Sequence, residues 1–160
     1  MAALDPGASF PSIALRDETG ASVSPPSGET LYVVFKTTCP TCELTWPYLE
    51  RIRETAEPGG LRVIAISQDD PAKTSAFNRR LRTRLETVYD PEPWKASDRL
   101  GVTNVPTFFR VAPDGKVAET VVGFTRDNME GFGRRAASLA GRPFTGVFRA
   151  GDQAPAIKPG

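Results

Sequence analysis

The sequence contains no histidine and only two cysteines among its 160 residues. Without histidine it lacks the side chain most often used as a general base near neutral pH and as a metal ligand. Two cysteines do not provide the four protein ligands of a structural zinc site. We therefore expect no metal and no cofactor, and any chemistry is expected at the cysteines.

The sequence also lacks an excess of charge of either sign and any long apolar run. Its 20 lysines and arginines nearly balance 19 aspartates and glutamates, for a net charge of +1. We therefore expect neither a nucleic-acid partner nor an acidic membrane partner, and no stretch approaches the roughly 20 apolar residues of a membrane helix. The opening MAALDPGASFP has no basic and no apolar part of an export signal. We expect a cytoplasmic protein, or a periplasmic one if an export signal has been removed.

A chain of this length fits one domain. We assign residues 1–160 to a single domain with a core at about 5–140 and a C-terminal tail at 141–160. Short β-branched and aromatic runs alternate with helical periodicity, a pattern typical of βαβ units and a mostly parallel sheet. The expected elements are a strand at 31–35, a helix from 39 or 40 to 57, a strand at 61–67, a helix at 70–86, a strand at 87–90, a short helix at 94–101, strands at 106–113 and 116–124, and a helix at 126–141.

Several expectations concern the ends of these elements. Phe77 and Leu85 are assigned to the buried stripe of the helix at 70–86, and Pro47 is expected to kink the first helix. Residues 10–15 are expected to form a short edge strand. The tail shows no clear periodicity, and its two phenylalanines are expected to dock on the domain.

The two cysteines, Cys39 and Cys42, follow directly on a buried strand, at the start of a helix. Unpaired N–H groups and the helix dipole favour an anion at that position, and here the anion is the thiolate of Cys39. Cys42 lies one helical turn deeper on the same face. One sulfur can then attack a substrate disulfide, and the other can resolve the mixed disulfide. A CxxC pair in a βαβ setting therefore indicates redox chemistry, although two buried structural thiols would also fit.

At these residues the sequence resembles the thioredoxin-fold proteins. That family has a proline five residues after its second cysteine, matched here by Pro47. It also has a cis-proline beside the cysteine pair, at the head of a terminal hairpin, matched by Pro106 in VPT and by PDG at residues 113–115. The resemblance implies a thioredoxin-like α/β fold, in which a central mixed β-sheet is flanked by helices.

The spacing of these motifs selects a branch of that superfamily. Pro106 follows Cys42 by 64 residues, a longer interval than in a minimal thioredoxin. The extra length is a βα insertion between the CxxC helix and the cis-proline hairpin, comprising the helix at 70–86 and the strand that follows. Together with the opening PGASFPSIALRDETG, it resembles the TlpA/ResA-like and AhpC/TSA (redoxin) branch.

The sequence departs from the family patterns at several positions. The peroxiredoxin pattern Pro-x-x-x-Thr/Ser-x-x-Cys would need those residues where Tyr32 and Lys36 stand. The carboxylates that handle protons for the deeper cysteine in thioredoxin and in TlpA/ResA-like proteins are replaced by Val33 and Thr45. A tryptophan before the first cysteine is replaced by Thr38. These changes disfavour a peroxidatic cysteine and leave the redox potential open.

The resemblance implies roles for the residues around the pair. Cys39 is the attacking nucleophile and Cys42 the resolving thiol, with Pro40 and Thr41 between them. A cis Pro106 would keep a backbone N–H away from the sulfurs and present the backbone of Val105 to a bound peptide. Two threonines are expected to line the site, namely Thr38 and Thr107.

The function expected from these residues is thiol–disulfide exchange with protein disulfides or dithiols, supported by an upstream thiol reductant, in a monomer. Two alternatives remain open. One is a peroxiredoxin-like thiol peroxidase, and the other is a non-catalytic thioredoxin-fold module that binds a partner or senses redox state. Trp46, Trp94 and Lys36 are assigned to packing or solvated surface. The arginines of the inserted helix, at positions 79, 80, 82 and 84, are assigned to a solvated face, with docking of an acidic partner as the alternative.

Overall fold

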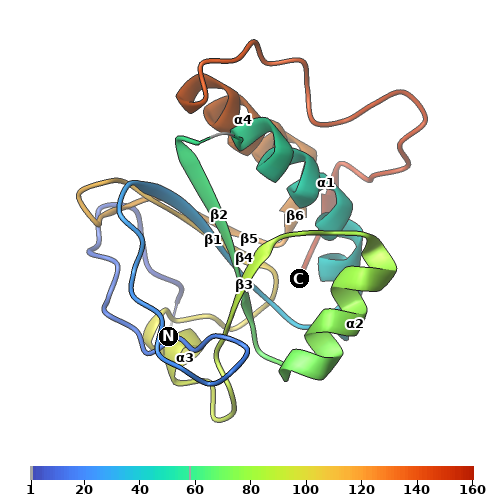
Figure 1. The fold of residues 1–160 in the computed structure, drawn as a ribbon. Coiled ribbons are helices and arrows are strands. Elements are labelled where there is room, and N and C mark those ends of the chain that lie inside the picture. Colours follow the sequence, from blue (N-terminus) through green and yellow to red (C-terminus); the bar gives the residue numbers. More distant parts are fainter. Residues whose placement is uncertain (1, 58) are drawn as a thin grey trace.

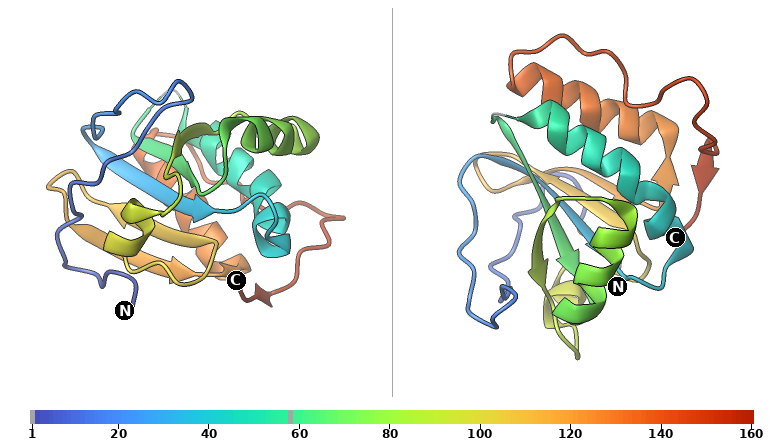
Figure 2. Two further views of the ribbon diagram at one scale, coloured as in Figure 1. Left: turned by 90° about the horizontal axis from the view of Figure 1, so that it is seen from below. Right: turned by 45° about the vertical axis from the view of Figure 1, so that its right-hand side comes forward.

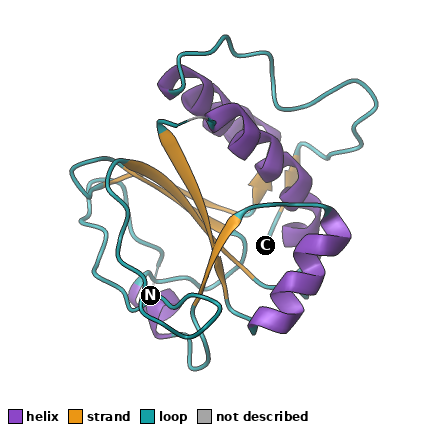
Figure 3. Ribbon diagram, viewed as in Figure 1, coloured by secondary structure: helices purple, strands orange, loops and turns teal. Residues whose placement is uncertain are grey.

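The computed structural model describes residues 2–57 and 59–160, and its centre is a five-stranded sheet in the order β3-β2-β1-β4-β5 (Figures 1 and 3). A second, two-stranded sheet joins β6 to β7. The elements in chain order are β1 (Glu29–Phe35), α1 (Pro40–Ala56), β2 (Leu61–Ser67), α2 (Pro71–Leu81), β3 (Glu86–Tyr89), α3 (Lys95–Arg99), β4 (Thr107–Val111), β5 (Val117–Val122), β6 (Phe124–Thr125), α4 (Arg126–Leu139) and β7 (Ile157–Lys158).

The sheet is mixed, as expected. β1 pairs in parallel with β2, and β2 with β3, whereas β4 runs antiparallel to β1 and β5 antiparallel to β4. Every residue of β1 is buried, because this central strand is covered on both faces. The parallel strands β1 and β2 end at the same edge of the sheet, where Phe35 pairs with Ser67. That edge carries the two cysteines.

The two faces of the sheet are covered differently. Helices α1 and α4 pack side by side on one face, where Figure 1 shows them together on one side of the strands. The opposite face is covered by α3 and by the N-terminal segment, which contributes Leu15 and Phe10 to a second apolar cluster. In the described ranges 2–57 and 59–160, no helix is both long enough and apolar enough to cross a membrane.

The inserted helix α2 is shorter than the sequence predicts. It begins after the N-cap Asp70, as expected, but ends at Leu81, and Arg82 adopts a left-handed conformation with φ of 56°. Leu85 is buried, yet it lies between α2 and β3 and not on the helix. The left-handed Arg82 ends the helix, and the backbone N–H of Thr83 donates to the Asn78 carbonyl oxygen at 3.0 Å. Beyond this end, the Glu50 carboxylate on α1 accepts hydrogen bonds from the backbone N–H of Arg84, at 3.0 and 3.1 Å.

The expected edge strand at residues 10–15 is also wrong. Isolated bridges flank this segment at Ser9 and Arg16, including a mutual backbone pair between Arg16 and Tyr89, but the segment itself forms no continuous ladder. Pro11 has no N–H to donate to a ladder. Pro47 lies within α1, which continues through it to Ala56. The first strand begins at Glu29, two residues before its expected start, and two arginines bind the Glu29 carboxylate.

Candidate active site

The turn between β1 and α1 places the two cysteines in different environments. Cys39 is the N-cap of α1, and its Sγ accepts a hydrogen bond from the backbone N–H of Cys42 at 3.2 Å. Pro40 occupies the first helical position, where its missing N–H leaves no helical hydrogen bond unmade. Cys39 is half-buried and Cys42 is fully buried, and both are free thiols. One sulfur therefore faces the surface, and the other lies behind it.

Burial also governs the acidity of the inner thiol. Desolvation raises the pKa of Cys42 far above its usual value, and the hydrogen bond with Cys39 raises it further. The nearby charge of Asp69 acts in the same direction. In the reduced protein Cys42 is therefore held as the neutral thiol.

The loop before β4 lies against the outer thiol. The Val105–Pro106 peptide bond is cis, as the resemblance implied. The Sγ of Cys39 donates a hydrogen bond to the carbonyl oxygen of Val105, at 3.3 Å. Thr107 is buried, and its hydroxyl donates to the Asn104 carbonyl oxygen at 2.6 Å. Thr107 therefore braces the loop that carries Val105.

The two threonines nearest the cysteines differ in accessibility. Thr38 is exposed beside Cys39. Thr41 is buried, and its hydroxyl donates to the carbonyl oxygen of Pro159, near the end of the tail, at 2.7 Å. Thr107, which was expected to line the site, is instead buried and contacts Asn104. The structure also adds a segment of the tail that the sequence did not assign to the site.

A carboxylate stands near the pair at a position that the sequence analysis missed. Asp69 follows β2, and its Oδ2 accepts hydrogen bonds from the backbone N–H and the hydroxyl of Thr37, at 2.7 and 2.9 Å. The positions expected from the family hold Val33 and Thr45, both buried. The sequence contained a signal for Asp69. The carboxyl ends of parallel strands lie together in a sheet, and Asp69 follows the carboxyl end of β2 just as the cysteines follow that of β1.

Cys39 opens into a hollow of about 480 Å³ between the active-site turn and α3. Trp94 lines this hollow, with its indole N–H donating to the Gln68 carbonyl oxygen at 2.9 Å. The ammonium group of Lys36 lies 4.7 Å from the centre of the Trp94 ring. Trp94 therefore forms part of the site wall, whereas Trp46 is fully buried, as its assignment to packing requires.

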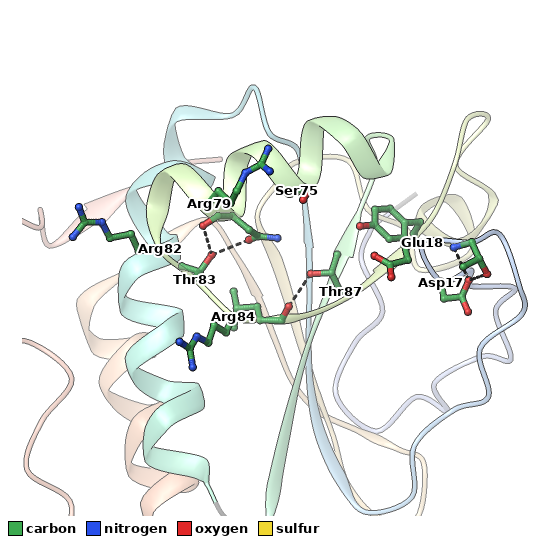
Figure 4. A pocket seen from close by; sticks show the side chains of 12 residues that line it. Asp17, Glu18, Ser75, Arg79, Arg82, Thr83, Arg84 and Thr87 are labelled. Carbon is green, nitrogen blue, oxygen red and sulfur yellow. Dashed lines mark hydrogen bonds between the residues drawn. The ribbon is translucent and has the colours of Figure 1, made fainter.

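A larger hollow, of about 810 Å³, lies away from the cysteines, between α2, β3 and the N-terminal segment. Its lining includes Arg79, Arg82 and Arg84, but Figure 4 shows their side chains pointing in different directions. Arg80 is paired with the exposed Glu43 of α1. These arginines do not converge on one point where an anion could be held. Among the described residues, no group of three or more histidine, cysteine, aspartate or glutamate side chains could hold a metal ion.

The sequence matches the profile of the AhpC/TSA family over residues 6–120. The chain belongs to this family. One curated relative is the thiol-disulfide oxidoreductase ResA of Bacillus thuringiensis, 28% identical over 98 residues. The match covers 60% of this chain and 56% of that relative, so the chain spans little more than half the length of the curated relative.

Solved structures confirm the fold expected for this AhpC/TSA family member. A thiol:disulfide interchange protein DsbE from Chlorobium tepidum aligns with a TM-score of 0.74 and 23% identity, over 86% of this chain and 99% of that chain. A thioredoxin-like protein from Porphyromonas gingivalis aligns with a TM-score of 0.64 and 18% identity, over 82% and 92%. The chain therefore has a thioredoxin-like fold.

Proposed function

We propose that this AhpC/TSA family member is a thiol–disulfide oxidoreductase that acts on protein disulfides through Cys39 and Cys42. One observation carries the proposal, namely the unequal exposure of two free thiols on a single helical turn. Cys39 lines an open hollow, and Cys42 is fully buried one turn along α1. Nucleophilic attack on a large substrate requires an accessible sulfur, and resolution requires a second sulfur within reach but shielded.

The proposed reaction transfers two electrons from the dithiol to the substrate. The Cys39 thiolate attacks one sulfur of the substrate disulfide, which forms a mixed disulfide and releases the other sulfur as a thiolate. Cys42 then attacks Sγ of Cys39. The Cys39–Cys42 disulfide forms, the second substrate sulfur leaves as a thiolate, and the two substrate thiolates take up the protons that the cysteine thiols lose.

The surrounding residues have supporting roles in the proposal. The Val105 backbone, positioned by Pro106, lies beside the attacking sulfur and would pair with the substrate peptide. Thr38 and Pro40 form the exposed rim, and Thr107 braces the loop that carries Val105. Thr41 lies in the first turn of α1, where its hydroxyl can bind a backbone carbonyl. An upstream thiol reductant regenerates the dithiol, and the protein works as a monomer that reduces its substrates in the cytoplasm. The ResA match supports the thiol–disulfide exchange in this proposal.

Single cysteine variants test the assignment. Cys39→Ser is expected to abolish reduction of a protein disulfide, whereas Cys42→Ser is expected to accumulate mixed disulfides that mass spectrometry can detect. Full activity in both variants would show that the assignment is wrong. Equilibrium titration in dithiothreitol and glutathione buffers then gives the direction of electron flow. A potential near or below about −250 mV supports a reductant, and one near about −120 to −180 mV supports an oxidant or isomerase.

A further inference from the structure

The tail at 141–160 returns from the end of α4 to the start of α1, next to the cysteines (Figure 2). It is anchored along its course by contacts remote from the site. The Phe148 ring packs on Tyr48 with ring centres 4.7 Å apart, and Asp152 pairs with Arg51 of α1 at 2.7 Å. Arg126 donates to the carbonyl oxygen of Ala154 at 3.0 Å. The tail therefore has a defined path across the domain.

Its last part then takes an extended conformation. β7 (Ile157–Lys158) pairs antiparallel with β6, with Lys158 opposite Phe124. Gly123, which precedes β6, allows a close approach, because a Cβ there would lie 3.1 Å from the carbonyl oxygen of Lys158. The pairing directs the following residues toward the active-site loops.

Pro159 and Gly160 lie between the first turn of α1 and the loop that carries Val105. The Thr41 hydroxyl donates to the Pro159 carbonyl oxygen at 2.7 Å, and the Asn104 side-chain amide donates to the Gly160 carbonyl oxygen at 3.3 Å. Gly160 packs on the Val105 backbone so tightly that a Cβ would lie 2.4 Å from the Val105 carbonyl oxygen. Residues 157–160 therefore touch the first turn of α1, the cis-proline loop and Gly123.

These contacts coincide with the path that a protein substrate needs. The Val105 carbonyl oxygen lies 3.3 Å from Sγ of Cys39, so a peptide whose disulfide reaches Cys39 must place its backbone beside Val105. Gly160 and Cys39 line the same hollow of about 480 Å³. An extended peptide that uses main-chain carbonyls as acceptors would bind in the manner of an added strand.

We propose that residues 157–160 are an intramolecular competitor for the protein substrate. The space that they occupy between Thr41, Asn104 and Val105 is called the Thr41–Val105 groove, and they must leave it before a substrate peptide enters. This inference rests on the proposed function. It assigns the groove to extended peptides that offer backbone carbonyls to Thr41 and Asn104 and a glycine-sized residue to Val105. Small disulfides reach Cys39 through the remaining hollow without displacing the tail.

A chain that ends at Ala156 tests the proposal. Its kcat/KM for reduction of a protein disulfide such as that of insulin is expected to rise about tenfold, as when a competent state populated at about one tenth becomes dominant. The rate with a small disulfide such as glutathione disulfide is expected to stay within about twofold. An unchanged or lower kcat/KM for insulin would overturn the proposal, because the tail would then be neutral or part of the substrate site.

Single substitutions distinguish the effect of releasing the tail from the effect of shortening the chain. Gly160→Ala adds one carbon against the Val105 backbone and is expected to reproduce the gain toward insulin. Ala156→Ser also adds one heavy atom, but on an exposed side chain outside the competing residues, and is expected to behave as the parent protein. Equal rates for Gly160→Ala and the parent would contradict the close packing on Val105.

A peptide titration completes the test. The peptide APAIKPG, which corresponds to residues 154–160, is expected to bind the shortened chain at millimolar concentration and to inhibit insulin reduction competitively, since tethered segments act at that order of effective concentration. The same peptide with alanine in place of its final glycine is expected to bind at least about tenfold more weakly. Equal binding of the two peptides, or none, overturns the proposal.

The outcomes also separate this inference from the proposed function. If Cys39→Ser abolishes insulin reduction but removal of the tail leaves kcat/KM unchanged, the proposed function stands and the proposed competition by residues 157–160 is wrong. If Cys39→Ser retains activity, the proposed function is wrong. The anisotropy of a labelled peptide requires no turnover, and it then decides by itself whether the groove binds the tail sequence.

Discussion

The thiol of Cys39 donates a hydrogen bond to the carbonyl oxygen of Val105 at 3.3 Å, across 66 positions of sequence. The same sulfur accepts from the backbone N–H of Cys42. A neutral thiol can do both, whereas a disulfide sulfur has no proton to donate. The state of the cysteine pair is thereby linked to the loop that carries Pro106.

Oxidation of the pair is therefore expected to change the carbonyl environment of Val105. The ¹³C resonance of that carbonyl should shift between the reduced and oxidised proteins, because the Val105 oxygen loses its hydrogen bond from sulfur. The carbonyl of Val63, in β2 and distant from the cysteines along the sheet, should shift little. NMR of ¹³C-labelled protein in both states checks this, and an unmoved Val105 signal would contradict the hydrogen bond.

The raised pKa of Cys42 should make the reduced protein less stable in alkali. The folded state keeps the Cys42 proton, whereas the unfolded thiol loses its proton above about pH 8.5. The contribution of Cys42 to the free energy of unfolding is therefore fully present below that pH. It is lost as pH rises, and the free energy of unfolding falls by up to about 1.4 kcal/mol per pH unit. Urea unfolding of the reduced protein between about pH 8 and 10 measures this fall in the free energy of unfolding.

Cys42→Ala provides the control for this pH dependence, because it removes the titrating group at the same buried position. Its free energy of unfolding should fall less steeply with pH than that of the parent protein. Parallel curves for the two proteins would show that the burial of Cys42 does not control its ionisation.

Asp69 should have two effects. Its charge should raise the pKa of Cys42, and its hydrogen bonds to Thr37 should stabilise the turn between β1 and α1. Asp69→Asn keeps an oxygen for Thr37 but removes the negative charge, so the pKa of Cys42 should fall. Asp69→Ala removes both bonds to Thr37 as well, and should lower the free energy of unfolding by about 1–3 kcal/mol more than Asp69→Asn. The ¹³Cβ shift of Cys42 against pH follows the first effect, and urea unfolding follows the second. A Cys42 pKa that rises in Asp69→Asn would contradict the assignment.

Glu29 should contribute strongly to stability. Its carboxylate is buried at the start of β1, and Arg135 binds it at 2.7 and 2.8 Å. The hydrogen bonds from Arg135 hold the pKa of Glu29 below its usual value, so this stabilisation is present above about pH 4.3 and is lost as the carboxyl is protonated in acid. Glu29→Ala should lower the free energy of unfolding at pH 7 by about 3 kcal/mol.

Glu119→Ala is the matched control for Glu29→Ala. Glu119 also pairs with Arg110, at 2.9 Å, but its side chain is 43% exposed. An exposed pair contributes about 0–1 kcal/mol. Denaturant unfolding of both variants should therefore show a clear difference, and similar losses would show that the burial of Glu29 adds little.

The features that the sequence predicted are those with local causes. The strand before Cys39, the proline at the first position of α1 and the PDG turn at 113–115 follow from side-chain preferences within a few residues. The thioredoxin-like fold and the neighbourhood of Cys39 and Pro106 followed from motifs at fixed spacing.

The features that the sequence did not predict depend on contacts between distant residues. Helical periodicity continues past Leu81, but α2 ends at the left-handed Arg82, and Glu50 of α1 binds the backbone of Arg84 beyond it. Nothing near Pro159 signals its hydrogen bond with Thr41, 118 residues away. Asp69 was visible in the sequence, but its relation to Thr37 required knowledge of which strands are neighbours.

The N-terminal segment also protects the sheet from other chains. Gly7 and Ala8 exchange backbone hydrogen bonds with Val117 at the start of edge strand β5, and Arg16 does so with Tyr89 at the end of edge strand β3. Unpaired edge strands are templates for aggregation through intermolecular strand pairing. A single stretch of about ten residues therefore blocks part of both edges at once, and its removal would expose two sites for self-association in one step.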